Sequence, residues 1–275
     1  METTEPGAWV ACAMSGGVDS SVAAALLQRQ GFHVIGVTMR LWDDGTEHPR
    51  ACCALTAVDD AKRVAVRLGI PHYVVDFTDE FRRQVIDDFI AEYRVGRTPN
   101  PCIRCNRFVK FATLLAHTRG LGATYLATGH YARVAQDGAR WSVRRGVDAG
   151  KDQSYALYGL TQAQLAHTLL PIGELQKTET RALAAELGLR VAGKPDSQEI
   201  CFIPDNDYGR FLREAAPAVT QPGPIIDRAG QQVGTHDGVA FYTIGQRRRL
   251  GVAIPAPRFV TALDAARNTV TIGPR

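Results

Sequence analysis

The sequence predicts an α/β fold with a parallel sheet covered on both faces, followed by a small β-rich domain. Between residues 9 and 129, short apolar runs alternate with segments of helical spacing. Beyond residue 206, short strand-like runs lie between Gly and Pro residues. The chain has 275 residues, 45% of them hydrophobic, which is enough for one large core or two ordinary ones. We therefore expect a first domain at residues 1–205 and a second at residues 206–275.

The first half of the chain alternates expected strands with expected helices. The first helix follows from the apolar spacing of Val18, Val22 and Leu26, and the second ends at Gly69. Residues 98–106 are rich in proline, which predicts that this segment is not helical at its start. Strands are expected at residues 9–13, 33–39, 72–77 and 124–129, and later helices at 56–69, 79–94 and 108–120.

After residue 130 the pattern becomes less regular. Residues 133–146 predict a hairpin that turns at Asp137 and Gly138. Helical stretches follow at about 161–169 and 178–188, and then an irregular loop over residues 193–207. Strand-like runs in the second domain are expected at residues 224–227, 231–234, 240–245, 258–264 and 268–273.

Composition and charge exclude several classes of protein. The net charge is +4, and 27 of the 32 basic residues are Arg, which suits contacts with phosphate. No run approaches the ~18 apolar residues of a membrane span, so no membrane association is expected. The first ten residues have two Glu and no basic residue, which is unlike a secretory signal. We expect a cytoplasmic protein.

Residues 15–21, Ser-Gly-Gly-Val-Asp-Ser-Ser, lie between the first expected strand and its helix. Glycines there let backbone N–H groups approach an anion, and a helix N-terminus adds a positive partial charge. The serine hydroxyls can donate hydrogen bonds, and Asp19 can hold Mg²⁺ against phosphate. Neither a Walker sequence nor a dinucleotide fingerprint occurs at this position. The pattern predicts a phosphate-binding loop of another kind.

Six cysteines are too few and too unevenly placed for a secreted disulfide framework. Cys102 and Cys105 follow a proline turn, and basic residues beside them would favour the thiolate. Cys201 lies in the irregular loop, whereas Cys12 is expected to pack in the core. No second Cys or His pair completes a four-ligand zinc site. Cys52 and Cys53 receive no role.

The loop resembles the signature of the PP-loop ATP pyrophosphatases, which split ATP between its α and β phosphates and leave AMP on a substrate oxygen. Further motifs follow in order: TPNPCIRCN, TGHYAR, KDQSYAL, KPDSQEICFIP and YTIGQRR. Together they resemble the tRNA-specific 2-thiouridylases from residue 13 to about residue 250. The resemblance implies a PP-loop (adenine nucleotide alpha hydrolase-like) domain and tRNA-uridine 2-sulfurtransferase activity. In that reaction ATP activates C2 of the wobble uridine of tRNA, and sulfur replaces its oxygen.

The resemblance also implies roles for single residues. Cys201 would carry a persulfide, and Cys105 would be the second catalytic thiol. Asp19 would hold Mg²⁺. The implied ATP-binding residues are Ala13, Met14, Ser15, Gly16, Gly17, Val18, Asp19, Ser20, Met39 and Gly129. Residues implied to lie at the target base or elsewhere on the tRNA are Thr98, Pro99, Asn100, Pro101, Cys102, His130, Lys151, Asp152 and Gln153.

Two routes for sulfur stay open. In the first, a cysteine desulfurase or sulfur carrier loads Cys201, whose persulfide displaces AMP from the adenylated base. Cys105 then breaks the S–S bond, leaving sulfur on the base and a Cys105–Cys201 disulfide. In the second, Cys102, Cys105 and Cys201 hold a 4Fe–4S cluster with one open iron.

The chain departs from the family pattern at three places. Position 102 is Cys where some members have Asp, and Arg249 replaces a usual Gly. The family's third, β-barrel domain would lie beyond Arg275, so we expect a chain that lacks it naturally or by truncation. Two other functions remain possible: a PP-loop ligase acting on a small molecule, and a non-catalytic RNA-binding module. The second would use Arg144, Arg145 and residues 247–249 as a positive patch.

Overall fold

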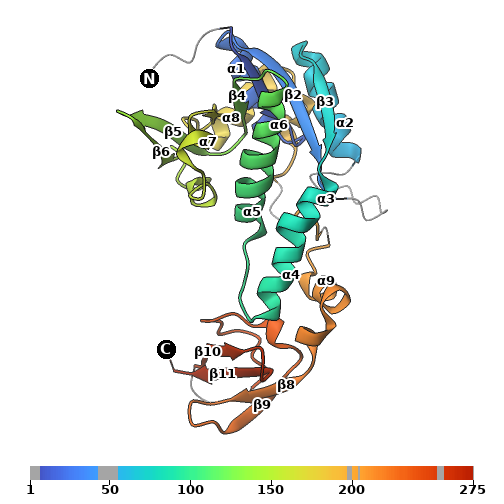
Figure 1. Ribbon diagram of the computed structural model, residues 1–275, viewed down its shortest axis with the longest axis vertical. Helices are drawn as coiled ribbons and strands as arrows, with labels where there is room; N and C mark the ends of the chain where they lie inside the picture. Colours follow the sequence, from blue (N-terminus) through green and yellow to red (C-terminus); the bar gives the residue numbers. More distant parts are fainter. Residues whose placement is uncertain (1–6, 43–54, 197–199, 204, 253–256, 275) are drawn as a thin grey trace. The chain divides into compact units, whose positions relative to one another are not determined.

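Figure 1 shows the computed structural model of the chain, which describes residues 7–42, 55–196, 200–203, 205–252 and 257–274. The chain divides into two compact units. Unit 1 comprises Met1–Gln84 and Cys102–Pro204, and unit 2 comprises Val85–Pro101 and Asp205–Arg275. Within the described ranges, no helix is both long enough and apolar enough to cross a bilayer.

Unit 1 contains a five-stranded parallel sheet, as the alternating pattern predicts. Its strand order is β3-β2-β1-β4-β7, and every neighbouring pair is parallel. The short strand β7 lies inside the stretch for which the sequence predicts a helix at about 161–169. The strands are β1 (Trp9–Ala13), β2 (His33–Arg40), β3 (His72–Asp76), β4 (Tyr125–Ala127) and β7 (Thr168–Leu169).

Helices cover both faces of this sheet, which confirms the predicted fold class. Val10 and Cys12 of β1 pack on one face with α1 (Val18–Arg29), α2 (Leu55–Leu68) and α8 (Lys177–Glu186). Ala11 points to the opposite face and packs there with Phe111, Leu114 and Leu115. Because alternate β1 side chains are buried on opposite faces, the strand is apolar throughout.

The helix that carries Cys102 and Cys105 begins earlier than the sequence predicts. Residues 98–100 are non-helical, as the prolines predict, but α5 (Pro101–Arg104) then continues without a break into η2 (Cys105–Leu114) and α6 (Leu115–Gly120), so the helix expected at 108–120 begins at Pro101. η2 is a π-helical stretch. Proline restricts the residue before it but is favourable in a first helical turn, where no N–H is needed. Both cysteines therefore lie in the first turns of a helix and not in a loop.

Smaller elements complete unit 1. The predicted hairpin is present as β5 (Ala132–Asp137) and β6 (Arg140–Arg145), and Gly138 adopts φ +57° in its turn. Figure 1 shows this hairpin beside α7. The remaining helical segments are α3 (Thr78–Phe81), η1 (Arg82–Ile86), η3 (Ser154–Ala156), α7 (Gln162–Leu165) and η4 (Arg190–Gly193); the η1 segment runs past the end of unit 1 at Gln84.

Unit 2 contains a four-stranded sheet in the order β10-β11-β8-β9, which confirms the predicted β-rich region. Two predictions differ from the structure. Residues 240–245 form no strand, because η6 (Val239–Phe241) occupies their start, and α9 (Tyr208–Ala215) was not predicted. The Asp207 side chain caps α9 by accepting from Arg210 N at 2.8 Å. The other elements are α4 (Asp87–Arg94), η5 (Pro217–Thr220), β8 (Gly223–Ile226), β9 (Gln232–His236), β10 (Phe259–Asp264) and β11 (Thr269–Gly273).

Candidate active site

The strand order places the predicted phosphate loop at the switch point of the parallel sheet. From β1 the chain goes to β2 and β3 on one side, and β4 and β7 lie on the other. Ligands of open α/β sheets bind where the order reverses, at the carboxyl ends of the strands. Residues 14–17 follow β1 there, and residues 128–130 follow β4. The segment after β4 touches the first turn of the helix that follows the loop, since a Cβ on Gly129 would lie 2.5 Å from Ser20 N.

Close backbone packing determines the shape of the loop. Gly16 adopts φ +69°, and a Cβ there would lie 2.2 Å from the Ala57 carbonyl oxygen. Ser20 Oγ accepts from Ser15 N at 3.2 Å, and the hydroxyls of Ser20 and Ser21 donate to the Gly17 carbonyl at 3.3 and 2.8 Å. Ser20 and Ser21 thus hold the loop in shape.

The first turn of α1 is suited to an anion. Gly17 precedes the helix and provides no side-chain cap. The backbone N–H groups of the first turn have no intrahelical partner and carry the positive end of the helix dipole. Ser15 is exposed beside them. Among the residues predicted to bind ATP, the loop and Gly129 are brought together, and Met39 lies near the carboxyl end of β2.

Asp19 lies in a network of charges that the sequence analysis did not identify. Lys177 Nζ is 2.8 Å from both Asp19 carboxylate oxygens and 2.8 Å from Asp196 Oδ1. The Tyr131 hydroxyl donates to Asp19 Oδ1 at 2.9 Å. The Lys177 side chain is only 11% exposed, so its charge is compensated almost entirely by these two carboxylates.

Asp196 forms ion pairs with several basic side chains of unit 1. Lys151 Nζ donates to Asp196 Oδ2 at 2.7 Å, and Arg181 donates to Oδ1 at 2.9 Å. Burial opposes ionisation of this carboxyl, but the hydrogen bonds from Lys151 and Lys177 overcome it and hold its pKa at about 2. A further lysine, Lys194, donates to the Gly16 carbonyl at 3.0 Å and pairs with Asp60 at 2.7 Å.

The predicted thiols have different environments. Cys105 is buried, Cys102 is exposed, and Cys201 is intermediate. Cys12 is fully buried, and burial raises the pKa of its thiol to about 12, so it packs in the core as predicted. Across the described ranges, no group of three or more His, Cys, Asp or Glu side chains could hold a metal ion, so the three-thiol cluster ligands are not assembled. Cys52 and Cys53 lie outside the described residues.

The predicted RNA-contacting residues are distributed over both units. In unit 1, Gln153 Oε1 accepts from Tyr131 N at 2.9 Å, and Asp152 accepts from Gly146 N at 2.9 Å and from Ser154 Oγ at 2.8 Å. Residues 98–101 belong to unit 2, where Thr98 Oγ1 lies 3.0 Å from Thr243 Oγ1.

His130 is buried close to the loop. Its Nδ1 lies 2.6 Å from Thr128 Oγ1, and its ring lies 6.1 Å from that of Phe111. Burial lowers the pKa of His130 to about 3, so the imidazole is neutral in the folded protein. With 9% of its surface exposed, this side chain packs between elements of unit 1, which favours a structural role.

A parallel sheet with a phosphate loop at its switch point defines an α/β nucleotide-binding domain of the HUP class. Residues 8–205 match the family model described as "tRNA methyl transferase HUP domain", and residues 209–274 match "tRNA methyl transferase PRC-barrel domain". A "tRNA-specific 2-thiouridylase MnmA" from Heliobacterium modesticaldum is 58% identical over 270 residues, 96% of this chain and 70% of the relative. Its counterpart from Clostridium perfringens is 54% identical over 268 residues, 96% and 75% of the two chains. The chain belongs to the tRNA-specific 2-thiouridylase family, which confirms the resemblance seen in its motifs.

A more distant similarity exists to a solved structure, that of a 4-thiouridine synthetase–RNA complex with bound ATP. It is 18% identical with a TM-score of 0.42, and the match covers 76% of this chain and 50% of the other.

Proposed function

We propose that this chain is the ATP-dependent enzyme that thiolates C2 of the wobble uridine of tRNA. The observation that carries the proposal is its 54–58% identity to 2-thiouridylases over 96% of its length. The phosphate loop, Cys105 and Cys201 are all present. Neither a small-molecule ligase nor a non-catalytic RNA module accounts for this combination as well. In domain terms, residues 1–205 would form the ATP-binding catalytic domain and residues 206–275 a second domain.

ATP would bind with its phosphates on the loop. The uncapped N–H groups at the start of α1 and the exposed Ser15 hydroxyl would hold the departing pyrophosphate. Lys177 and Lys194 lie at the same loop, where Lys177 would hold Asp19 in position and Lys194 would hold the Gly16 carbonyl. Asp19 offers one carboxylate for Mg²⁺, an ion that accepts one or two carboxylates together with phosphates and waters. Bound there, Mg²⁺ would neutralise phosphate charge.

Sulfur transfer would then use the two thiols in turn. A cysteine desulfurase or sulfur carrier would load Cys201 with a persulfide. Its terminal sulfur attacks C2 of the adenylated uridine, and AMP leaves with the original oxygen. The Cys105 thiolate attacks the Cys201 sulfur, which breaks the S–S bond and leaves the terminal sulfur on the base. A Cys105–Cys201 disulfide results, and an external thiol must reduce it.

The iron–sulfur route requires Cys102 as a third ligand. Since the described residues do not gather such a ligand set, we derive no step through a cluster. The two routes predict different outcomes for Cys102→Ser. Metal-free protein supplied with a persulfide donor should thiolate tRNA with or without this substitution if the persulfide route holds. Loss of thiolation together with loss of brown absorbance from anaerobically reconstituted protein would support the cluster.

The tRNA contacts are proposed from the motifs. Lys151, Asp152 and Gln153 would face the RNA from unit 1. Residues 98–101 and Cys102 would lie against the target base, and His130 would lie near the RNA.

One experiment tests the whole function. Protein, ATP, a persulfide donor and tRNA are incubated, the RNA is digested, and 2-thiouridine is measured by mass spectrometry. Wild-type protein should form 2-thiouridine and release pyrophosphate in a tRNA-dependent manner. Asp19→Ala should abolish both while remaining folded. Pyrophosphate release by Asp19→Ala at the wild-type rate would disprove the assignment of the loop, and absence of 2-thiouridine with wild-type protein would disprove the function.

A further inference from the structure

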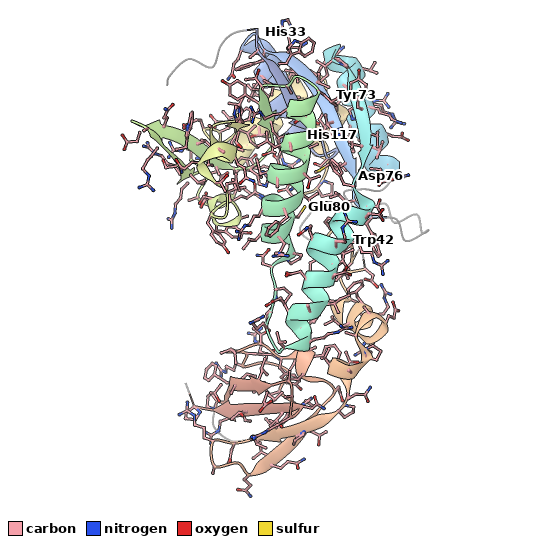
Figure 2. The ribbon with its side chains drawn as sticks, in the orientation of Figure 1. His33, Trp42, Tyr73, Asp76, Glu80 and His117 are labelled. Atoms are coloured by element: carbon pink, nitrogen blue, oxygen red, sulfur yellow. The ribbon has the colours of Figure 1, made fainter. Side chains whose placement is uncertain are left out.

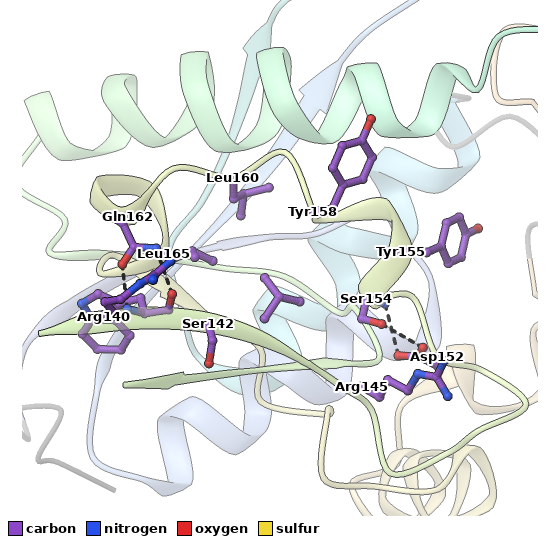
Figure 3. Close-up of a pocket in the computed structure, with 12 residues that line it drawn as sticks. Arg140, Ser142, Arg145, Asp152, Ser154, Tyr155, Tyr158, Leu160, Gln162 and Leu165 are labelled. Atoms are coloured by element: carbon purple, nitrogen blue, oxygen red, sulfur yellow. Dashed lines mark hydrogen bonds between the residues drawn. The ribbon is translucent and has the colours of Figure 1, made fainter. Parts of the chain in front are cut away.

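Unit 1 has an open cleft beside the Lys151–Gln153 segment (Figure 3). Strand β6 forms one side, and the segment that runs from Asp152 to α7 forms the other. Its volume is about 490 Å³, within the ~300–1,000 Å³ typical of ligand sites. Val143, Leu160 and Leu165 supply apolar surface to its lining. Side-chain bonds at the two ends fix the cleft, since Gln162 binds the Trp141 backbone at 2.7 and 2.9 Å and Ser154 binds Asp152.

Two large aromatic side chains at this cleft are exposed. Tyr155 is 61% and Tyr158 72% exposed, and Figure 3 shows both rings extending from the segment after Ser154. Exposed aromatic rings are a stacking platform for unpaired bases, and each such contact contributes ~1–3 kcal/mol. A phenol ring has two apolar faces and a polar hydroxyl group, so it can stack on a base while its hydroxyl remains in contact with solvent.

The charges at the cleft suit a phosphate backbone. Arg140 and Arg145 line it, and Arg144 lies next to them on β6. Within the part of the chain that the structure describes, Arg140 and Arg144 form no ion pair. The cleft has one carboxylate in its lining, Asp152, and this group already accepts hydrogen bonds from Gly146 N, Ser154 N and Ser154 Oγ. The Arg140 and Arg144 guanidinium groups therefore remain available for an anion, and Arg145, which interacts with the Asp152 carboxylate, adds positive charge to the cleft.

We propose that this cleft holds an unpaired nucleotide of the tRNA substrate. Its base would lie against Tyr155 and Tyr158, and its phosphates would contact Arg140 and Arg145. Arginine favours this task because its planar group binds phosphate in a bidentate manner. The cleft also continues directly from Asp152, which belongs to the segment proposed to contact tRNA. The inference rests on the proposed function and extends the proposed RNA contact from Asp152 into the cleft.

The test measures the dissociation constant for unmodified tRNA, without ATP, by filter binding. Tyr158→Ala should weaken binding about tenfold, the effect expected for one lost stacking contact. Tyr158→Phe should bind like wild type, because it keeps the ring. Arg145→Gln should weaken binding. It should also make log K fall less steeply with log[salt], by the amount expected when about one phosphate contact is lost.

Tyr73→Ala is the matched control. Tyr73 is 59% exposed on β3, at a distance from this cleft in the sequence and on a different sheet (Figure 2). It should bind tRNA like wild type. Equal binding by wild type and Tyr158→Ala, or equal weakening by Tyr158→Ala and Tyr158→Phe, would overturn the proposal. Equal binding by wild type and Tyr158→Ala, together with normal 2-thiouridine formation, would refute the role of the cleft but not the proposed function. Tyr158-dependent binding without 2-thiouridine would refute the function alone.

Discussion

Replacing Lys177 by Met tests the network at the phosphate loop. The substitution keeps a long side chain but removes the ammonium that lies between Asp19 and Asp196. It deletes three charge-assisted contacts of 2.8 Å, two to Asp19 and one to Asp196. Two carboxylates would then face the same space without the cation between them. The protein should lose stability and also bind ATP more weakly, because Asp19 loses the contact that orients it.

The burial of the three side chains determines the magnitude. Their exposed fractions are 11% for Lys177, 30% for Asp19 and 21% for Asp196. Breaking a buried ion pair by removing one partner costs ~3–5 kcal/mol. Asp19 keeps its bond from Tyr131, and Asp196 keeps Lys151 and Arg181, so the lower end applies, about 3 kcal/mol. For a chain of this size that is a fall in Tm of about 6–12 °C.

Differential scanning fluorimetry as a function of pH checks both the size and the cause. The pKa of Asp196 is lowered to about 2 in the folded protein, so its contribution is complete above the unfolded value of ~3.9. That contribution is lost as pH falls from about 4 towards 2. The Tm gap between wild type and Lys177→Met should therefore be constant from pH 5 to 8 and should close below pH 4.

Lys62→Met is the control, because Lys62 is an exposed lysine on α2. It should melt within 1–2 °C of wild type, as expected for a surface substitution worth less than ~0.5 kcal/mol. If Lys177→Met melts with the control, or if its deficit persists unchanged at pH 3, the ion-pair network does not stabilise the protein as argued.

Three further predictions address single groups. Gly129→Ala should abolish ATP binding, measured by titration calorimetry, because its Cβ would lie 2.5 Å from Ser20 N; wild-type affinity would contradict the contact between the two segments. Cys105→Ser and Cys201→Ser should each stop 2-thiouridine formation while tRNA-dependent pyrophosphate release continues, and normal thiolation by Cys105→Ser would refute two-thiol exchange. His130 has a folded pKa of about 3, below its unfolded value, so stability should fall as pH decreases from ~6.5 to 3, and His130→Gln should flatten that dependence.

The sequence predicted the sheet well because its signals are local. Apolar runs such as residues 9–13 and 33–39 are buried on both faces and stand out between helical segments. The loop at residues 14–17 could be predicted for the same reason, since strand, glycines and helix are contiguous. The structure shows that the strand order reverses at β1, because β1 pairs with β4 as well as with β2. No local pattern in the sequence reveals that pairing.

Sequence patterns predicted some element boundaries and short elements less well. The prolines correctly predict that residues 98–100 are not helical, but the helix expected at 108–120 begins at Pro101, in a first helical turn where proline is favourable. Strand β7 has two residues and exists because β4 offers it an edge. Helix α9 begins after Asp207, whose side chain caps it; an Asp at this position is a helix-start signal that the sequence contains.

Lys177, the cation that binds Asp19, could not be found from motifs. Lys177 is 158 positions from Asp19 in sequence, and only the fold brings them together. One compositional signal was available. The chain has five lysines against 27 arginines, and three of the five, Lys151, Lys177 and Lys194, lie in the network around the phosphate loop. At these three positions a compact ammonium is used where the chain elsewhere mostly uses the planar guanidinium group.

The geometry of Asp196 links two parts of the proposed reaction. Through Lys177 it contacts Asp19 at the phosphate loop, and through Lys151 it contacts the segment proposed to bind tRNA. Because one carboxylate anchors both, a change that displaces it would disturb ATP binding and RNA binding together. Substitution of Asp196 should therefore impair activation and tRNA binding alike, whereas substitution of Cys201 should impair only the sulfur transfer that follows activation.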